Sequence, residues 1–110
     1  MATNQMDQEC MSLCKAMNLI PGIKTVESCC GHGEWPFKIW FIADTLESLP
    51  PLLYWFDPCH CGLREWAATV YTDCAMSPVV FRITGPVGTE AYDGAEKIAH
   101  LINDASIVGV

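Results

Sequence analysis

A short glycine-containing loop between two strand-like segments constrains the fold of this chain more than any other feature. Residues 24–29 and 37–43 both have the composition of short strands, and the run Ser28-Cys29-Cys30-Gly31-His32-Gly33 stands at their junction. The second segment alternates with the period of two that marks a strand with one buried face: Phe37, Ile39 and Phe41 point one way, and Lys38, Trp40 and Ile42 point the other. The two segments are therefore predicted to pair as a β-hairpin.

Helical periodicity is clearest at the two ends of the chain. Before Pro21-Gly22 the apolar residues recur at spacings of three and four: Met6, Cys10, Leu13, Cys14 and Met17. A last helix over residues 90–103 is predicted to bury Ala91, Ala95, Ile98, Ala99 and Ile102. Between them, a second helical region that opens at Asp44 is predicted in two pieces, a short turn and then a helix that starts near Pro51 and closes at Asp57-Pro58. Its expected buried face is formed by Leu46, Leu49, Leu52, Leu53 and Phe56.

The remaining segments predict a second pair of strands. These strands are expected over residues 65–72 and 79–84, with a loop at 59–62, a turn at 73–78 and a flexible connector at 85–88. In the first of them Trp66, Ala68 and Val70 are expected to share one face. The order α-β-β-α-β-β-α predicts one α+β domain over residues 1–110, a two-layer sandwich of a mostly antiparallel four-stranded sheet and about three helices.

Composition narrows the classes of partner. The formal charge is −7 and only six residues are basic, which argues against duplex nucleic acid but leaves a small anionic ligand open. The chain has four Trp, four Phe and three Tyr, a surplus that favours a ligand pocket or a homo-oligomer interface. No apolar run reaches the length of a membrane helix, and the first residues do not resemble a signal peptide. We therefore expect a cytoplasmic protein with no membrane partner.

Seven cysteines without an export signal favour reduced thiols. Zinc is one use for them: Cys29 or Cys30 with His32, joined by Cys59 and Cys61 or by His60, would offer four ligands from two loops. Neither cluster has the Cys-x-x-Cys spacing of zinc ribbons, so no metal or other cofactor is expected and zinc stays the alternative. A nucleophilic thiol activated by His32 or His100 lacks an orienting third group, so no catalytic residue is predicted. Packing is the simplest role for Cys10, Cys14 and Cys74.

The hairpin loop is the predicted binding element. Gly31 and Gly33 permit positive φ and let backbone amides approach an anion, His32 can donate to that anion, and Trp35 can stack on a base. Arg64 and Arg82 are the only guanidinium groups available for bidentate phosphate contacts. The predicted ligand site contains Ser28, Cys29, Cys30, Gly31, His32, Gly33, Trp35, Arg64, Asp73 and Ser77. The alternative is that the glycines only form a hairpin turn, that Arg64 is a solvated strand flank, and that Asp73 and Ser77 belong to an ordinary turn.

Two motifs carry a resemblance to known families. The run from Ile20 to Gly33, followed by Pro36 and Ile39-Trp40-Phe41, resembles an uncharacterised family of small phage and bacterial proteins, and residues 71–78 resemble its second signature. More distantly, residues 25–31 and the Trp-containing strand are similar to the N-terminal part of the wybutosine-pathway tRNA methyltransferases. That similarity implies a sandwich core and a nucleotide-derived ligand near Ser28, Cys29 and Gly31. Those enzymes are much longer than this chain and hold a polyanionic RNA, which its charge of −7 does not favour.

These features lead to three functional hypotheses. The first is a small oligomeric protein that captures a nucleotide-like or other small anionic metabolite. By its size and expected phage source it also resembles the anti-defence sponge proteins, which sequester immune signals of a bacterial host. The second is a reduced, S-adenosylmethionine-dependent methyltransferase-like protein that acts on a nucleobase or nucleoside. The third is a zinc-stabilised interaction module.

Overall fold

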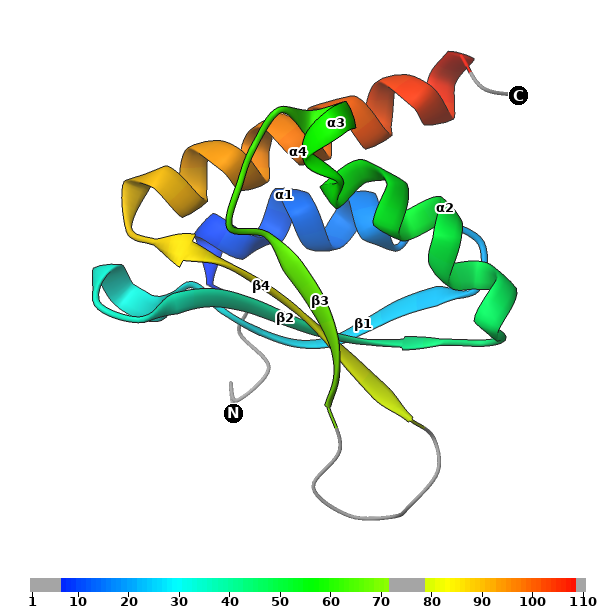
Figure 1. Cartoon of the computed structure of the whole chain (residues 1–110), viewed down its shortest axis with the longest axis horizontal. Coiled ribbons are helices and arrows are strands. Elements are labelled where there is room, and N and C mark those ends of the chain that lie inside the picture. The colour runs from blue at the N-terminus through cyan, green and yellow to red at the C-terminus, as the bar shows by residue number, and fades with distance from the viewer. Residues whose placement is uncertain (1–6, 72–78, 109–110) are drawn as a thin grey trace.

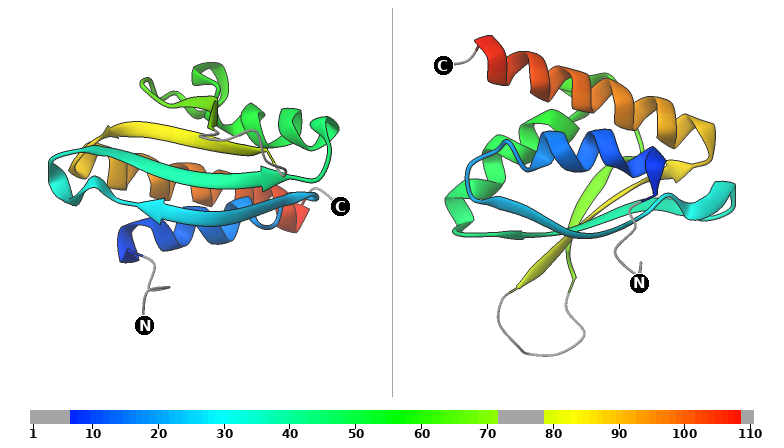
Figure 2. Two further views of the ribbon diagram at one scale, coloured as in Figure 1. Left: turned by 90° about the horizontal axis from the view of Figure 1, so that it is seen from below. Right: turned by 180° about the vertical axis from the view of Figure 1, so that it is seen from behind.

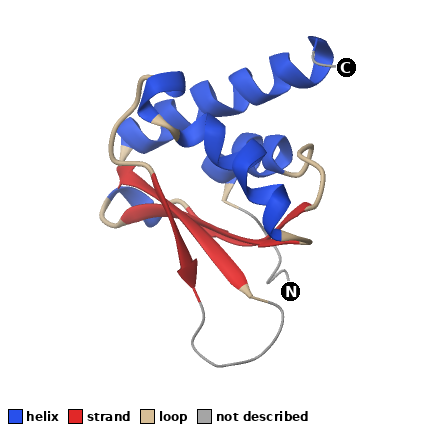
Figure 3. Ribbon diagram, turned by 45° about the vertical axis from the view of Figure 1, so that its right-hand side comes forward, coloured by secondary structure: helices blue, strands red, loops and turns tan. Residues whose placement is uncertain are grey.

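The computed structural model describes residues 7–71 and 79–108 and arranges them as two layers, with the helices on one side of a single sheet (Figures 1 and 3). The long helices are α1 (Gln8–Met17) and α4 (Thr89–Val108), and the short ones between strands are α2 (Leu49–Leu53) and α3 (Pro58–Cys61). The strands are β1 (Ile23–Cys29), β2 (Pro36–Ala43), β3 (Ala67–Tyr71) and β4 (Val80–Val87). No helix in these two ranges is both long and apolar enough to span a bilayer.

The sheet has the strand order β1-β2-β4-β3, and all three strand pairs are antiparallel. The chain thus forms two hairpins, β1–β2 and β3–β4, that join through β2 and β4. If the short helices between β2 and β3 are counted as one helical region, the elements follow the order α-β-β-α-β-β-α. The predicted α+β sandwich is confirmed.

The core lies between the inner face of strands β2 and β4 and the two long helices, α1 and α4. Phe37, Ile39 and Phe41 on β2 are fully buried, as the alternation of that strand predicts. They meet the inner faces of the two long helices, which pack against each other. The residues predicted to be buried by the last helix are all buried: Ala91, Ala95, Ile98, Ala99 and Ile102.

Strand β4 extends through Gly85 and Pro86 to Val87, so the prediction of a flexible connector at residues 85–88 is wrong. Gly-Pro is normally a turn signal, but here both residues are buried, and the Trp66 ring lies against the backbone at Gly85. A Cβ at Gly85 would lie 2.7 Å from that ring. The glycine is therefore needed for packing and does not form a turn.

Three more local predictions need correction. Residues 59–61 of the segment expected to be a loop belong to α3, whose N-cap Asp57 accepts a hydrogen bond from the backbone N–H of Cys59. Leu46, expected to be buried, is 74% exposed because it lies in a short 3-10 turn before α2. Strand β3 begins at Ala67 and not at residue 65, because Glu65 has a left-handed backbone with φ 70°.

Candidate functional site

The predicted loop is a compact left-handed turn at the tip of the β1–β2 hairpin. Gly31, His32 and Gly33 have φ values of 82°, 54° and 83°, and the carbonyl of Gly31 accepts hydrogen bonds from the backbone N–H groups of Glu34 and Trp35. A Cβ on Gly31 would lie 3.1 Å from the carbonyl oxygen of Pro36. Three consecutive left-handed residues, one of them a histidine, fix the direction of the chain at this point.

Cys30 supports the turn from inside. Its backbone N–H donates to Asp7 Oδ2 at 2.9 Å, and its Sγ accepts the backbone N–H of His32 at 3.3 Å. The side chain is 4% exposed, and this burial raises the pKa of the thiol above its usual value, although the His32 N–H bond lowers it in part. A buried thiol that resists ionisation is a poor nucleophile. Cys30 therefore fits a supporting role and not catalysis.

Ser28 faces the interior with two more cysteines of α1. Burial raises the pKa of the Cys10 thiol to about 12, and a hydrogen bond from Ser28 opposes the shift. Burial also raises the pKa of Cys14. Both thiols are at most 1% exposed, as expected of packing residues. Cys74, assigned the same role, lies outside the described residues.

The raised pKa of Cys10 predicts a loss of stability in alkali. The unfolded chain releases this proton near 9.0 and the folded chain near 12, so the folded state keeps a proton that the unfolded state has lost. The free energy of unfolding should be insensitive to this thiol below pH 9 and should fall as the pH rises from 9 toward 12. Urea unfolding across that range would show a shallower fall for Cys10→Ala than for the wild type. Parallel curves for the two proteins would contradict the assignment.

The other predicted site residues do not gather around the loop. The Trp35 side chain is 65% exposed, and Arg64 is exposed in the segment between α3 and β3, with no hydrogen bond or ion pair to the described loop residues. Asp73 and Ser77 lie outside the described residues. The last described residue of β3 and the first residue of β4, Tyr71 and Val80, pair with each other at the strand ends opposite the β1–β2 hairpin tip.

The larger feature is the sheet face that the described helices leave uncovered (Figure 2, left). Cross-strand partners point to the same side of a sheet, so the strand register places twelve side chains on this face, none of them buried. We call it the open face. Its three rows, from β1 to β3, are Lys24, Ile42, Val80 and Tyr71; Glu27, Trp40, Arg82 and Thr69; and Cys29, Lys38, Thr84 and Ala67.

The open face is positive in a strongly acidic chain. Lys24, Lys38 and Arg82 are three of the six basic residues of the sequence, and Glu27 is the one carboxylate among the twelve side chains. The chain as a whole carries −7. A positive surface on an acidic protein attracts small anions to one place.

Arg82 lies at the centre of the open face among aromatic rings. Its guanidinium carbon is 5.2 Å from the centroid of the Tyr71 ring, and the Tyr71 and Trp40 rings meet edge to face at 6.0 Å. Arg82 Nε is buried without a hydrogen-bond partner, and no carboxylate in residues 7–71 or 79–108 pairs with this side chain. A buried donor without a partner is unfavourable, and it is often satisfied by a ligand or by water.

No protein-family model, curated protein or solved structure matches this chain. The family resemblances of the sequence motifs therefore stay predictions, and we infer function from the geometry of the site.

Sequence reasoning considered Arg82 as a phosphate ligand but missed its neighbours Trp40, Tyr71 and Lys38. A signal was present, because the alternation of β2 placed Lys38, Trp40 and Ile42 together on the side opposite Phe37, Ile39 and Phe41. What was missing was the strand order, which places β4 and then β3 beside β2 and so brings Arg82 and Tyr71 to Trp40.

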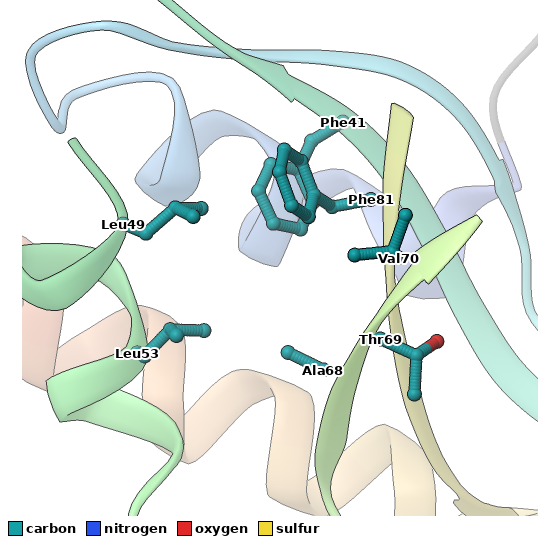
Figure 4. A pocket seen from close by; sticks show the side chains of 7 residues that line it. All are labelled: Phe41, Leu49, Leu53, Ala68, Thr69, Val70 and Phe81. Atoms are coloured by element: carbon teal, nitrogen blue, oxygen red, sulfur yellow. The ribbon is translucent and has the colours of Figure 1, made fainter. Parts of the chain in front are cut away.

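An apolar hollow lies on the helix side of the sheet, between α2 and β3 (Figure 4). It has a volume of about 160 Å³ and is lined by Phe41, Leu49, Leu53, Ala68, Thr69, Val70 and Phe81. Ala68 and Val70 point inward, as their predicted shared face requires, yet remain exposed because α2 does not cover this end of β3. Thr69 is the one polar residue of the lining, and its side chain points away from the hollow, so this hollow does not suit an anion.

Proposed function

We propose that this protein binds a small nucleotide-like anion on the open face, with Arg82 as the central contact. The observation that carries the proposal is the Arg82 guanidinium, which lies against Tyr71 and beside Trp40 with no carboxylate partner in the described chain. A cation next to two aromatic rings is the arrangement that recognises a ligand with both a phosphate and a base.

The spacing of the sheet suits such a ligand. Lys38 and Arg82 are diagonal neighbours on adjacent strands, so their Cβ atoms lie about 7–8 Å apart and both side chains can reach one phosphate. Trp40 lies directly across from Arg82 and offers its ring to a base. The face measures about 14 Å by about 14 Å from the usual strand and residue spacings. That area holds one or two nucleotide units, as when sheet-face aromatics stack bases in RNA-binding domains.

The predicted loop borders this face without forming it. Cys29 pairs with Lys38 in the row nearest the hairpin tip, so residues 30–35 follow directly from the open face. Most backbone N–H groups of residues 30–35 already have hydrogen-bond partners in the protein. The exposed His32 side chain is therefore what the turn offers to a ligand that extends toward the tip. The predicted role of the loop is thus compatible with the proposal, but the main contacts move to β2, β4 and β3.

The charge of the face also bears on the predicted homo-oligomer. Two copies that pack symmetrically through the open face would bring Lys24, Lys38 and Arg82 of each copy toward those of the other. Like charges close together across an interface are unfavourable. An anion on this face is the better match, and any self-association should use another surface.

Isothermal titration calorimetry tests the proposal with a panel of nucleoside monophosphates, cyclic nucleotides, cyclic ADP-ribose isomers and S-adenosylmethionine. We expect saturable binding of at least one phosphorylated member, weakened by added salt because the contacts are charged. Binding without turnover of a cyclic nucleotide signal would support the sponge role, and binding of S-adenosylmethionine alone would favour the methyltransferase alternative. No binding of any member by folded protein would overturn the proposal.

A further inference from the structure

We propose a second site, which borders the open face and shares Cys29 with it: Asp7, Cys29 and His32 bind a zinc ion where the N-terminus of α1 meets the β1–β2 hairpin. One ligand-capable atom from each of the three residues lies within 4.8 Å of the other two. The chain brings them together from positions far apart, since Asp7 precedes α1, Cys29 ends β1 and His32 lies in the hairpin turn. Cys59 and Cys61, the partners that the sequence suggested, lie in α3 and do not belong to this group of described residues.

Asp7 is turned toward the site and away from its own helix. It occupies the N-cap position of α1, where aspartate normally accepts a backbone N–H of the first turn, yet its side chain makes no such bond. Instead Oδ2 accepts the backbone N–H of Cys30 at 2.9 Å. No lysine or arginine pairs with Asp7 within the described chain. The second carboxylate oxygen thus remains available to a cation beside Cys29 and His32.

The histidine is held by the backbone and by the neighbouring thiol. His32 has a left-handed backbone, with φ 54° and ψ 28°, which is uncommon for a residue with a side chain. Its Nδ1 lies 3.7 Å from the Cys30 Sγ, which also accepts the His32 backbone N–H. Cys30 therefore orients the imidazole in the way that outer partners orient metal-binding histidines.

The ligand set suits zinc in coordination number and chemistry. Thiolate, imidazole and carboxylate are all zinc ligands, and bond lengths of about 2.0–2.3 Å place tetrahedral ligand atoms about 3.3–3.8 Å from one another. The ligand atoms of the three side chains now lie within 4.8 Å of one another, and small side-chain rotations would bring them to these distances. Binding would release the Cys29 thiol proton to solvent. Three protein ligands leave a fourth position for water on the exposed side of His32, the arrangement of zinc sites that accept an exogenous ligand.

Cobalt(II) titration of tag-free, reduced, chelator-treated protein gives a direct test, because cobalt replaces zinc and reports thiolate coordination through a near-ultraviolet charge-transfer band. We expect one ion per chain with this band, and displacement by zinc. Cys29→Ser should abolish the band, and Asp7→Asn and His32→Asn should each raise the Kd at least about tenfold. Asparagine is chosen for position 32 because it tolerates the left-handed backbone. Cys59→Ser, which removes an exposed thiol of α3, is the matched control and should bind as the wild type does.

Three outcomes would overturn the site: no saturable binding by folded protein, unchanged binding in all three ligand variants, or loss of the band in the Cys59→Ser control alone. The readout involves no nucleotide, so it is independent of the proposed function. A failure of cobalt binding would leave the open face untouched, and a failure of nucleotide binding would leave the metal site untouched.

Discussion

Replacing Trp66 with alanine should destabilise the fold by about 3–5 kcal/mol, the range for removing a large buried aromatic side chain. Trp66 is 7% exposed and lies immediately before β3. Its ring meets Phe37 of β2 edge to face at 5.5 Å and Phe56 at 5.9 Å. The same ring lies over glycines of β4 and α4, so one side chain fills the space between the sheet and the last helix.

Chemical denaturation of two tryptophan variants would measure this loss. Trp35→Ala is the matched control, because that ring is 65% exposed and its removal should change the free energy of unfolding by less than about 0.5 kcal/mol. Equal losses in the two variants would contradict the packing role of Trp66.

A double-mutant cycle of Trp66→Ala and Gly85→Ala tests whether the Trp66 ring packs directly against β4. Three atoms of the Trp66 ring would lie 2.7–2.9 Å from a Cβ at position 85, so Gly85→Ala should destabilise the wild-type protein. In the Trp66→Ala background the added methyl group enters the vacated space and should be tolerated. We expect a coupling free energy above about 1 kcal/mol between the two positions. Additive effects would mean that the ring does not press against this strand.

Arg82→Gln should weaken binding of the nucleotide-like ligand on the order of 10- to 150-fold. This range corresponds to losing a charge-assisted hydrogen bond worth about 1.5–3 kcal/mol. The fold should tolerate the change, because Arg82 Nε is buried without a partner and the contact with Tyr71 contributes only about 0.5–1 kcal/mol at a partly exposed position. Lost affinity with nearly unchanged stability distinguishes a binding residue from a structural one.

Arg64→Gln is the matched control for Arg82→Gln. It removes the second guanidinium of the chain, and Arg64 lies outside the open face, in the segment between α3 and β3. Calorimetry with the best-binding member of the panel should give an almost unchanged Kd for Arg64→Gln. A larger loss with Arg64→Gln than with Arg82→Gln would favour the site first inferred from sequence, in which Arg64 joins the hairpin loop.

The parts of the fold that follow from local patterns were predictable. The buried face of β2 and the buried face of α4 follow from periods of two and about 3.6, because burial on one side of an element imposes that period on its sequence. The extension of β4 through Gly85 and Pro86 was not predictable in this way. It depends on Trp66, which lies 19 positions earlier in the printed sequence and packs against the strand only in the folded chain.

The candidate sites also combine features that follow from local sequence patterns with features that depend on distant contacts. The left-handed turn at Gly31 and Gly33 was expected from glycine chemistry, and the face of β2 that carries Lys38 and Trp40 was expected from alternation. The position of Arg82 beside Trp40 depends on strand order, and the approach of Asp7 to Cys29 and His32 depends on how α1 packs against β1. Neither contact leaves a periodic signal, because both join segments that are distant in sequence.

Amide NMR during a nucleotide titration would locate the bound nucleotide on the protein. We predict that the largest shift changes lie in the open-face positions of β2, β4 and β3, centred on Trp40, Arg82 and Tyr71, with smaller changes at the hairpin tip. The amides of α1 and α4 should change little. Shift changes confined to residues 30–35, or concentrated at the apolar hollow between α2 and β3, would contradict nucleotide binding on the open face.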